Sequence, residues 1–227
     1  MGKPDPEHEA ALAALERLKI FPLPGSVLVP AGYLPLHVFE PRYREMTADC
    51  LAGDRVLAVA TLAPGWETNY EGRPPIFPVM GVGYIEKDEK LSNGRFNILL
   101  RGLFRVRMLD EHPATRAYRE IQAARIPDVV HAQDREQLGS MAITLQRLVL
   151  DLATAMPDSS ARPLSRAAAA ERDPGRLADL VGAAVLTDAE PRQSFLEEVD
   201  VRRRIEAATE RVSQMLLQVS QPMGGEA

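Results

Sequence analysis

The hydrophobic pattern of this chain changes its period once, and that change limits the fold more than any other feature. Up to residue 127 the apolar residues fall in short runs separated by glycine and proline, as in β-strands. From Asp128 onward they recur every three or four residues, as in amphipathic helices. Strands followed by helices are typical of an α+β protein. We therefore predict a β-rich subdomain at residues 18–127 and an all-helical subdomain at residues 128–220.

Both ends of the chain extend beyond these subdomains. Leu12, Leu15 and Leu18 recur at three-residue steps in an alanine-rich segment, which predicts a short helical extension at residues 1–17. The polar residues 221–227 continue no hydrophobic stripe, and we expect a disordered tail there.

The stretch from Ile20 to Leu51 joins a β segment to a helix. Its first part is apolar but contains four prolines, which cannot donate to a sheet ladder, so we expect short strands at edges or bulges. Pro41 suits the first position of a helix. Tyr43, Met46 and Cys50 then form one apolar stripe, which predicts a helix with a buried face.

Three further signals define the β-rich half. Asn93-Gly94 is typical of a β-hairpin with a type I′ turn. Gly81 inside an apolar run indicates a bulge or a close backbone contact. Arg105 and Arg107 alternate with apolar residues, which predicts a half-buried strand with both arginines facing solvent.

The composition excludes several classes of protein. A formal net charge of −5 and a pI near 5.5 argue against a nucleic-acid-binding protein, which normally carries a basic surface. The single cysteine allows no internal disulfide and fits a reducing compartment. No signal peptide and no apolar run of membrane-spanning length is visible, so we expect a cytoplasmic protein with no membrane partner.

Three motifs carry a resemblance to a known family. They are FPLPGSVLVPAGYLPLHVFEPRYREM near the start, RGLFRVRML in the β-rich half, and QSFLEEVDVRRRI near the end. Together they resemble the LON domain, the substrate-binding N-terminal domain of Lon proteases, from about Ile20 to Leu217. The resemblance implies a six-stranded, PUA-like pseudo-barrel. It also implies a module that binds unfolded or partly folded polypeptide through exposed apolar surface, beside a protease or a chaperone.

The catalytic parts of Lon proteases have no counterpart in this sequence. The only lysines are Lys3, Lys19, Lys87 and Lys90, and none belongs to the Gly-Lys-Ser/Thr motif of a Walker A loop. The helical half has no lysine for a Ser–Lys protease dyad. We therefore expect a stand-alone substrate-binding domain that is not an enzyme and has no cofactor.

Other catalytic or metal-binding groups are also not indicated. Cys50 could act as a nucleophile with His37 as its base, but Cys50 shares the apolar stripe of the predicted helix, and free cysteine is usually buried. We interpret Cys50 as a core residue and His37 as a structural hydrogen-bonding residue. The four histidines lack the paired spacing of metal ligands, so we expect no metal site.

Two stretches allow a functional interpretation beside a structural one. Residues 101–125 hold six arginines against three acidic residues. They form either the solvated face of a sheet or, as an alternative function, the basic patch of an RNA-binding PUA-like module.

The second stretch is the loop after the strand at residues 55–62. It is rich in glycine and proline, yet it contains Trp66 and Tyr70, with Phe77 close behind. These rings either fold back onto the barrel or bind a ligand, and both alternatives stay open. We predict that Trp66, Tyr70, Phe77 and Tyr33 form a peptide-binding surface.

Overall fold

The computed structural model describes residues 5–156 and 161–220, so the tail expected at residues 221–227 lies outside the described residues. The chain divides into two compact units. The β-rich unit contains Met1–Pro127 and Asp188–Glu197, and the helical unit contains Asp128–Thr187 and Glu198–Ala227. The chain therefore passes from one unit to the other three times.

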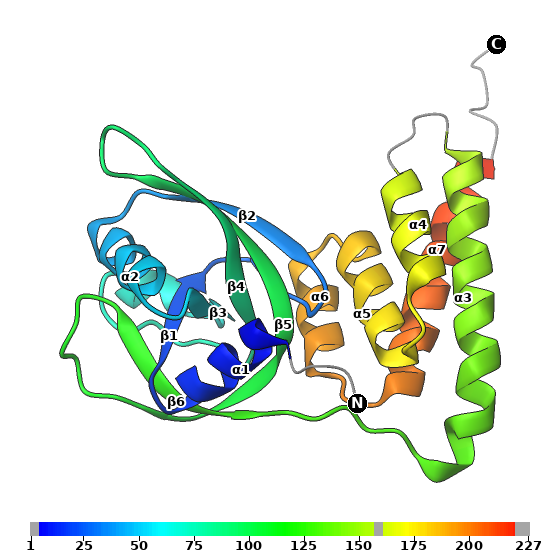
Figure 1. Cartoon of the computed structure of the whole chain (residues 1–227), viewed down its shortest axis with the longest axis horizontal. Coiled ribbons are helices and arrows are strands. Elements are labelled where there is room, and N and C mark those ends of the chain that lie inside the picture. The colour runs from blue at the N-terminus through cyan, green and yellow to red at the C-terminus, as the bar shows by residue number, and fades with distance from the viewer. Residues whose placement is uncertain (1–4, 157–160, 221–227) are drawn as a thin grey trace. The chain divides into compact units, whose positions relative to one another are not determined.

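The β-rich unit is built on one six-stranded sheet (Figure 1). The strand order is β2-β5-β4-β3-β1-β6, and an additional pairing of β5 with β6 closes five of the strands into a ring. Only β1 and β3 run parallel, while the other pairs are antiparallel. The α+β fold expected from the sequence is confirmed. The strands are β1 (Leu18–Leu23), β2 (Tyr33–Val38), β3 (Val56–Thr61), β4 (Val79–Lys90), β5 (Phe96–Glu111) and β6 (Arg119–Arg125).

Strand β5 links β2 to the ring because it is long enough to serve two partners. Its residues Phe96–Arg101 pair with β2, and its residues Val106–Glu111 pair with β6. The hairpin between β4 and β5 lies where it was predicted, but its turn is not type I′. A type I′ turn needs two residues at positive φ, and here only Gly94 has one, at 77°. The Gly94 N–H donates to the Leu91 carbonyl, as in a type I turn followed by a glycine bulge.

A close backbone crossing explains the predicted contact at Gly81. A Cβ atom placed on Gly81 would lie 1.8 Å from the carbonyl oxygen of Leu28. The segment before β2 therefore crosses the sheet at a distance that only glycine permits.

Two apolar cores lie on the two sides of β3. Val56, Ala58 and Ala60 belong to the cluster inside the ring. Leu57 and Val59 belong to a second cluster, which is covered by α2 (Pro41–Ala52). All six residues of β3 are buried as a result. Met46 and Cys50 lie in the second cluster with no exposed surface, so their prediction as core residues is confirmed.

Helix α6 (Ala189–Glu197) belongs to the β-rich unit, although the hydrophobic pattern places these residues in the predicted helical subdomain at 128–220. The Gln193 amide donates to the Val79 carbonyl at 3.0 Å and accepts from the Thr61 hydroxyl at 2.9 Å. The Arg105 guanidinium donates to the Leu196 carbonyl at 2.8 Å and is only 3% exposed. The prediction that Arg105 faces solvent is therefore wrong, because α6 covers this part of β5.

The helical unit consists of four α-helices and the short η3 in the described residues. Its two longest helices lie side by side (Figure 1). Leu145 and Val149 on the first and Val212 on the second have no exposed surface. The Asp173 side chain accepts from the Arg176 N–H at 2.8 Å and caps the N-terminus of the helix that starts at Pro174. The helices are η3 (Ala132–Asp134), α3 (Arg135–Ala155), α4 (Arg162–Ala170), α5 (Pro174–Val185) and α7 (Val201–Ser220).

A buried ionic cluster joins three segments of the helical unit. Arg204 on α7 has no exposed surface. Its Nη1 lies 2.6 Å from Asp179 Oδ1 on α5, and its Nη2 lies 2.7 Å from Asp128 Oδ2 at the start of the unit. Asp179 is also buried, so this pairing compensates charges that water does not reach.

Candidate polypeptide-binding surface

The structure brings Trp66 and Tyr70 together. Trp66 begins the short 3₁₀ helix η2 (Trp66–Asn69) in the loop after β3. The two rings meet edge to face, with their centroids 5.6 Å apart, and both side chains are half-buried. The Tyr70 hydroxyl donates to Glu40 Oε1 at 2.7 Å. Burial and the Glu40 carboxylate raise the pKa of Tyr70, so the hydroxyl stays a donor at neutral pH.

Arg42 fixes the backbone of this loop to the start of α2. Its guanidinium donates to the Tyr70 carbonyl at 3.2 Å and to the Glu71 carbonyl at 3.3 Å. The same group lies 5.0 Å from the Tyr70 ring and forms an ion pair with Glu40 at 2.9 Å. Because Pro41 starts the helix between Glu40 and Arg42, these two side chains are held at its first turn. The loop is therefore anchored at Tyr70.

The other two predicted site residues lie elsewhere in the β-rich unit. Tyr33 begins β2 and is 53% exposed, with its pKa raised by burial and by Glu86. Phe77 is half-buried, and its N–H donates to the Thr61 carbonyl at the end of β3. Among the described residues, no hydrogen bond or ring contact joins Tyr33 or Phe77 to the Trp66–Tyr70 pair.

Phe39 is an exposed aromatic residue that the sequence analysis missed. It is 57% exposed and directly precedes Glu40, the residue that holds Tyr70. An apolar residue at this position, just before a helix N-cap, often packs on the fourth helical residue. That residue is Arg44 here, so Phe39 lacks an apolar partner along the helix and instead lies 6.2 Å from the His37 ring. No ring contact joins Phe39 to Trp66 or Tyr70 in the described residues, and Phe39 is linked to them only as the neighbour of Glu40. On that basis we group Phe39, Trp66 and Tyr70 and call them the aromatic surface.

Most arginines of residues 101–125 already have partners within the protein. Arg101 pairs with Glu86 and Glu7, and Arg119 makes two hydrogen bonds to Glu111. Arg105 is buried beneath α6, as described above. Arg116 lies 3.6 Å from Asp49, and Arg125 lies over the Phe104 ring. This pairing weakens the alternative of an RNA-binding patch, which needs unpaired cations.

Cys50 and His37 do not form a nucleophile–base pair. The Cys50 thiol donates to the Val56 carbonyl at 3.2 Å inside the core, and the His37 ring bonds to Asn97 at the surface. Burial raises the pKa of Cys50 to about 12, which keeps the thiol protonated. The described residues contain no cluster of three or more His, Cys, Asp or Glu side chains that could hold a metal ion.

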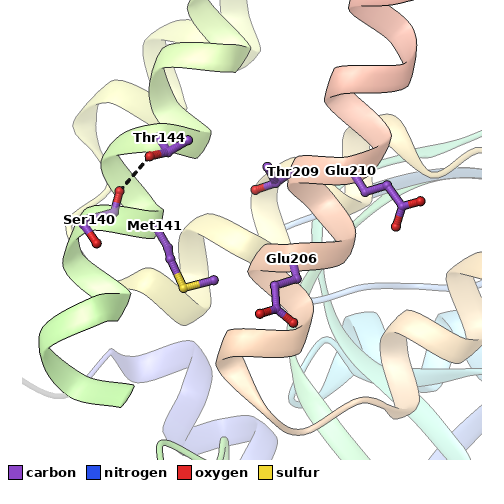
Figure 2. Close-up of a pocket in the computed structure, with 6 residues that line it drawn as sticks. All are labelled: Ser140, Met141, Thr144, Glu206, Thr209 and Glu210. Atoms are coloured by element: carbon purple, nitrogen blue, oxygen red, sulfur yellow. Dashed lines mark hydrogen bonds between the residues drawn. The ribbon is translucent and has the colours of Figure 1, made fainter. Parts of the chain in front are cut away.

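The helical unit has a shallow groove of about 330 Å³ between α3 and α7 (Figure 2). Ser140 and Thr144 bond to carbonyls of their own helix, and Glu206 pairs with Arg202 on α7. Across the described part of this groove no hydroxyl bonds to a carboxylate, so it offers no activated nucleophile. No helix in the described residues is long and apolar enough to cross a membrane.

Comparison with known families settles which part of the Lon resemblance is present. The family described as the ATP-dependent protease La (LON) substrate-binding domain matches residues 17–214. The chain belongs to this family. The match covers the β-rich unit from the end of the short 3₁₀ helix η1 (Ala14–Arg17) and nearly all of the helical unit.

Curated relatives are Lon proteases much longer than this chain. The Lon protease of Desulfosudis oleivorans is 26% identical over 203 residues, which are 88% of this chain and 24% of that protein. The Lon protease of Anaeromyxobacter dehalogenans is 29% identical over 196 residues, which are 85% of this chain and 22% of that protein. The chain therefore spans less than a quarter of the length of these two relatives.

Solved structures confirm the fold. The N-terminal domain of a Mycobacterium avium complex Lon protease aligns with a TM-score of 0.66 at 18% identity, covering 87% of this chain and 98% of that one. A Lon N-terminal domain protein from Xanthomonas campestris aligns with a TM-score of 0.56 at 21% identity, covering 84% and 95%.

Proposed function

We propose that this chain is a non-catalytic, cytoplasmic protein-binding module that holds unfolded or partly folded polypeptide through exposed apolar surface. The observation that carries the proposal is the family match, which covers the substrate-binding domain and extends over most of this chain. A protease or a chaperone would act on the polypeptide that the module holds.

The aromatic surface supports this proposal because its residues suit binding without sequence specificity. Large rings bury much apolar area against many different side chains, and each Å² removed from water contributes about 25 cal/mol. The hydrogen bond to Glu40 and the contacts of Arg42 hold Tyr70 in place before any ligand arrives. Pre-ordered rings lose little conformational entropy on binding, so weak contacts still give measurable affinity.

The test compares two forms of one ligand protein. A fluorescent disulfide-containing protein is titrated with this chain in its native form and in its reduced, unfolded form, and anisotropy reports binding. We expect binding of the unfolded form only, with little change between low and high salt. Equal binding of both forms, or of neither, would contradict the proposal. A steep loss with salt, together with binding of single-stranded RNA, would favour the RNA-binding alternative.

Two substitutions then locate the surface. Phe39→Ser removes an exposed ring from the aromatic surface, and Ile143→Ser removes a 68% exposed side chain from α3 as a matched control. We expect Phe39→Ser to weaken binding by about tenfold, or about 1.4 kcal/mol, and the control to leave it unchanged. Equal effects of both substitutions would place the contact outside the aromatic surface.

A further inference from the structure

Helix α1 (Pro6–Ala13) lies across the open end of the barrel (Figure 1). Ala11 has no exposed surface and belongs to the apolar cluster inside the ring, together with Val82 on β4 and Phe104 on β5. The His8 ring lies 5.9 Å from the Phe104 ring. A segment near the start of the chain therefore covers apolar residues of the barrel interior.

Charge pairs hold both ends of this segment. At its start, Glu7 forms an ion pair with Arg101 on β5. Just after the helix, Arg17 pairs with Glu120 at 2.8 Å. Arg101 belongs to the arginine-rich stretch of residues 101–125, so part of that stretch pairs with an acidic helix of the same chain.

Several features make α1 easy to displace. It has eight residues, and isolated helices of that length are marginal in water. Its only fully buried side chain is that of Ala11, which contributes little apolar area, while Leu12 is 41% exposed. The Glu7 and Arg101 side chains are 31% and 26% exposed, so solvent screens their attraction. The family match begins at residue 17, after this helix.

We propose that α1 is a removable cover and that an apolar segment of the bound polypeptide takes its place at the end of the barrel. This inference rests on the proposed function and names a second contact for the same ligand. The segment that fits resembles α1 itself, with small apolar side chains over Phe104 and an acidic residue beside Arg101. The Arg125 guanidinium, 5.2 Å from the Phe104 ring, lies beside the same site.

Full-length variants test whether the cover can be displaced. Glu7→Lys reverses the charge that pairs with Arg101, and Ala11→Arg places a long cation at the buried position. Glu9→Lys makes the same charge change at an exposed position and is the matched control. The probe is a fluorescent peptide with the sequence of residues 5–17. We expect the first two variants to bind it at least tenfold more tightly than the control and the unmodified chain. Equal binding by all four proteins would overturn the proposal.

Competition separates this inference from the proposed function. A reduced, unfolded protein should displace the peptide from Glu7→Lys and should bind this variant more tightly than it binds the control. If the unfolded protein binds all four proteins equally and leaves the peptide in place, the proposed function stands and the proposal that α1 is a removable cover is wrong. If it binds none of them, the proposed function fails.

Hydrogen exchange of the unmodified chain gives a check that needs no variant. We expect the amides of α1 to exchange faster than those at the centres of β4 and β5, because the cover opens without unfolding of the barrel. Equal protection of α1 and these strands would show that the helix is an integral part of the core and would overturn the proposal.

Discussion

Glu40 and Arg42 show how single side chains position the aromatic surface. The start of α2 at Pro41 follows from the sequence, because proline suits the first turn of a helix. The hydrogen bond from Tyr70 to Glu40 joins residues 30 positions apart, and no local pattern indicates it. The sequence therefore identifies Trp66 and Tyr70 as unusual loop residues, but it leaves open where the loop is attached.

Met46 allows a direct test of the core beneath α2. Its side chain has no exposed surface and packs in the cluster that contains Cys50. We expect Met46→Ala to lower the free energy of unfolding by about 2–5 kcal/mol, because it removes apolar contacts and leaves a cavity. Urea unfolding measures the change, with the neighbouring exposed Glu45→Ala as control. A loss below about 0.5 kcal/mol, the usual size at the surface, would contradict this packing.

Cys50 predicts a pH dependence of stability. Burial raises its pKa from 9.0 to about 12, so the native thiol keeps its proton where the unfolded thiol has lost it. Between these values the native thiol holds a proton that the unfolded thiol has lost, so the contribution of Cys50 to the free energy of unfolding falls as pH rises above 9. We expect a shallower fall for Cys50→Ala, measured by urea unfolding at several pH values. Identical slopes for both proteins would contradict the buried position of the thiol.

At the scale of elements, the hydrophobic period predicts the order of strands and helices well. The Asn93-Gly94 pair also predicts the position of the β4–β5 hairpin, although not its turn type. The hydrophobic period fails to place α6, because it indicates a helix there but does not show that this helix packs in the β-rich unit. Gln193 bonds to Val79, 114 residues earlier, and Arg105 becomes buried through the same packing. Such long-range contacts depend on the fold of the whole chain.

The cluster of Arg204, Asp179 and Asp128 should be essential for packing α5 against α7. Asp179→Ala leaves the buried guanidinium with one fewer counter-charge, which should cost about 3–5 kcal/mol of unfolding free energy. Arg203→Ala is the matched control, since Arg203 is exposed and 3.6 Å from Glu198, a pair worth at most about 1 kcal/mol. Similar losses for both variants would contradict the importance of this cluster.

At the scale of the whole molecule, the chain returns to the β-rich unit after it has formed most of the helical unit. A fragment of residues 1–127, the boundary that the sequence suggests, lacks α6 and loses the hydrogen bonds from Arg105 to Leu196 and from Thr61 to Gln193. We expect this fragment to melt well below the full chain or to aggregate. Joining residues 188–197 to it through a flexible linker should restore a cooperative transition in calorimetry. Equal melting of the fragment with and without α6 would contradict this division.

The central claim is that the chain binds unfolded polypeptide at the aromatic surface, and the emission of Trp66 tests it most directly. Trp66 is the only tryptophan, so a reduced, unfolded ligand without tryptophan leaves its emission as the sole signal. Covering a half-exposed indole removes it from water, and we predict a blue shift that saturates and that weakens in Tyr70→Ala. Unchanged emission, while anisotropy shows that the ligand is bound, would contradict the claim.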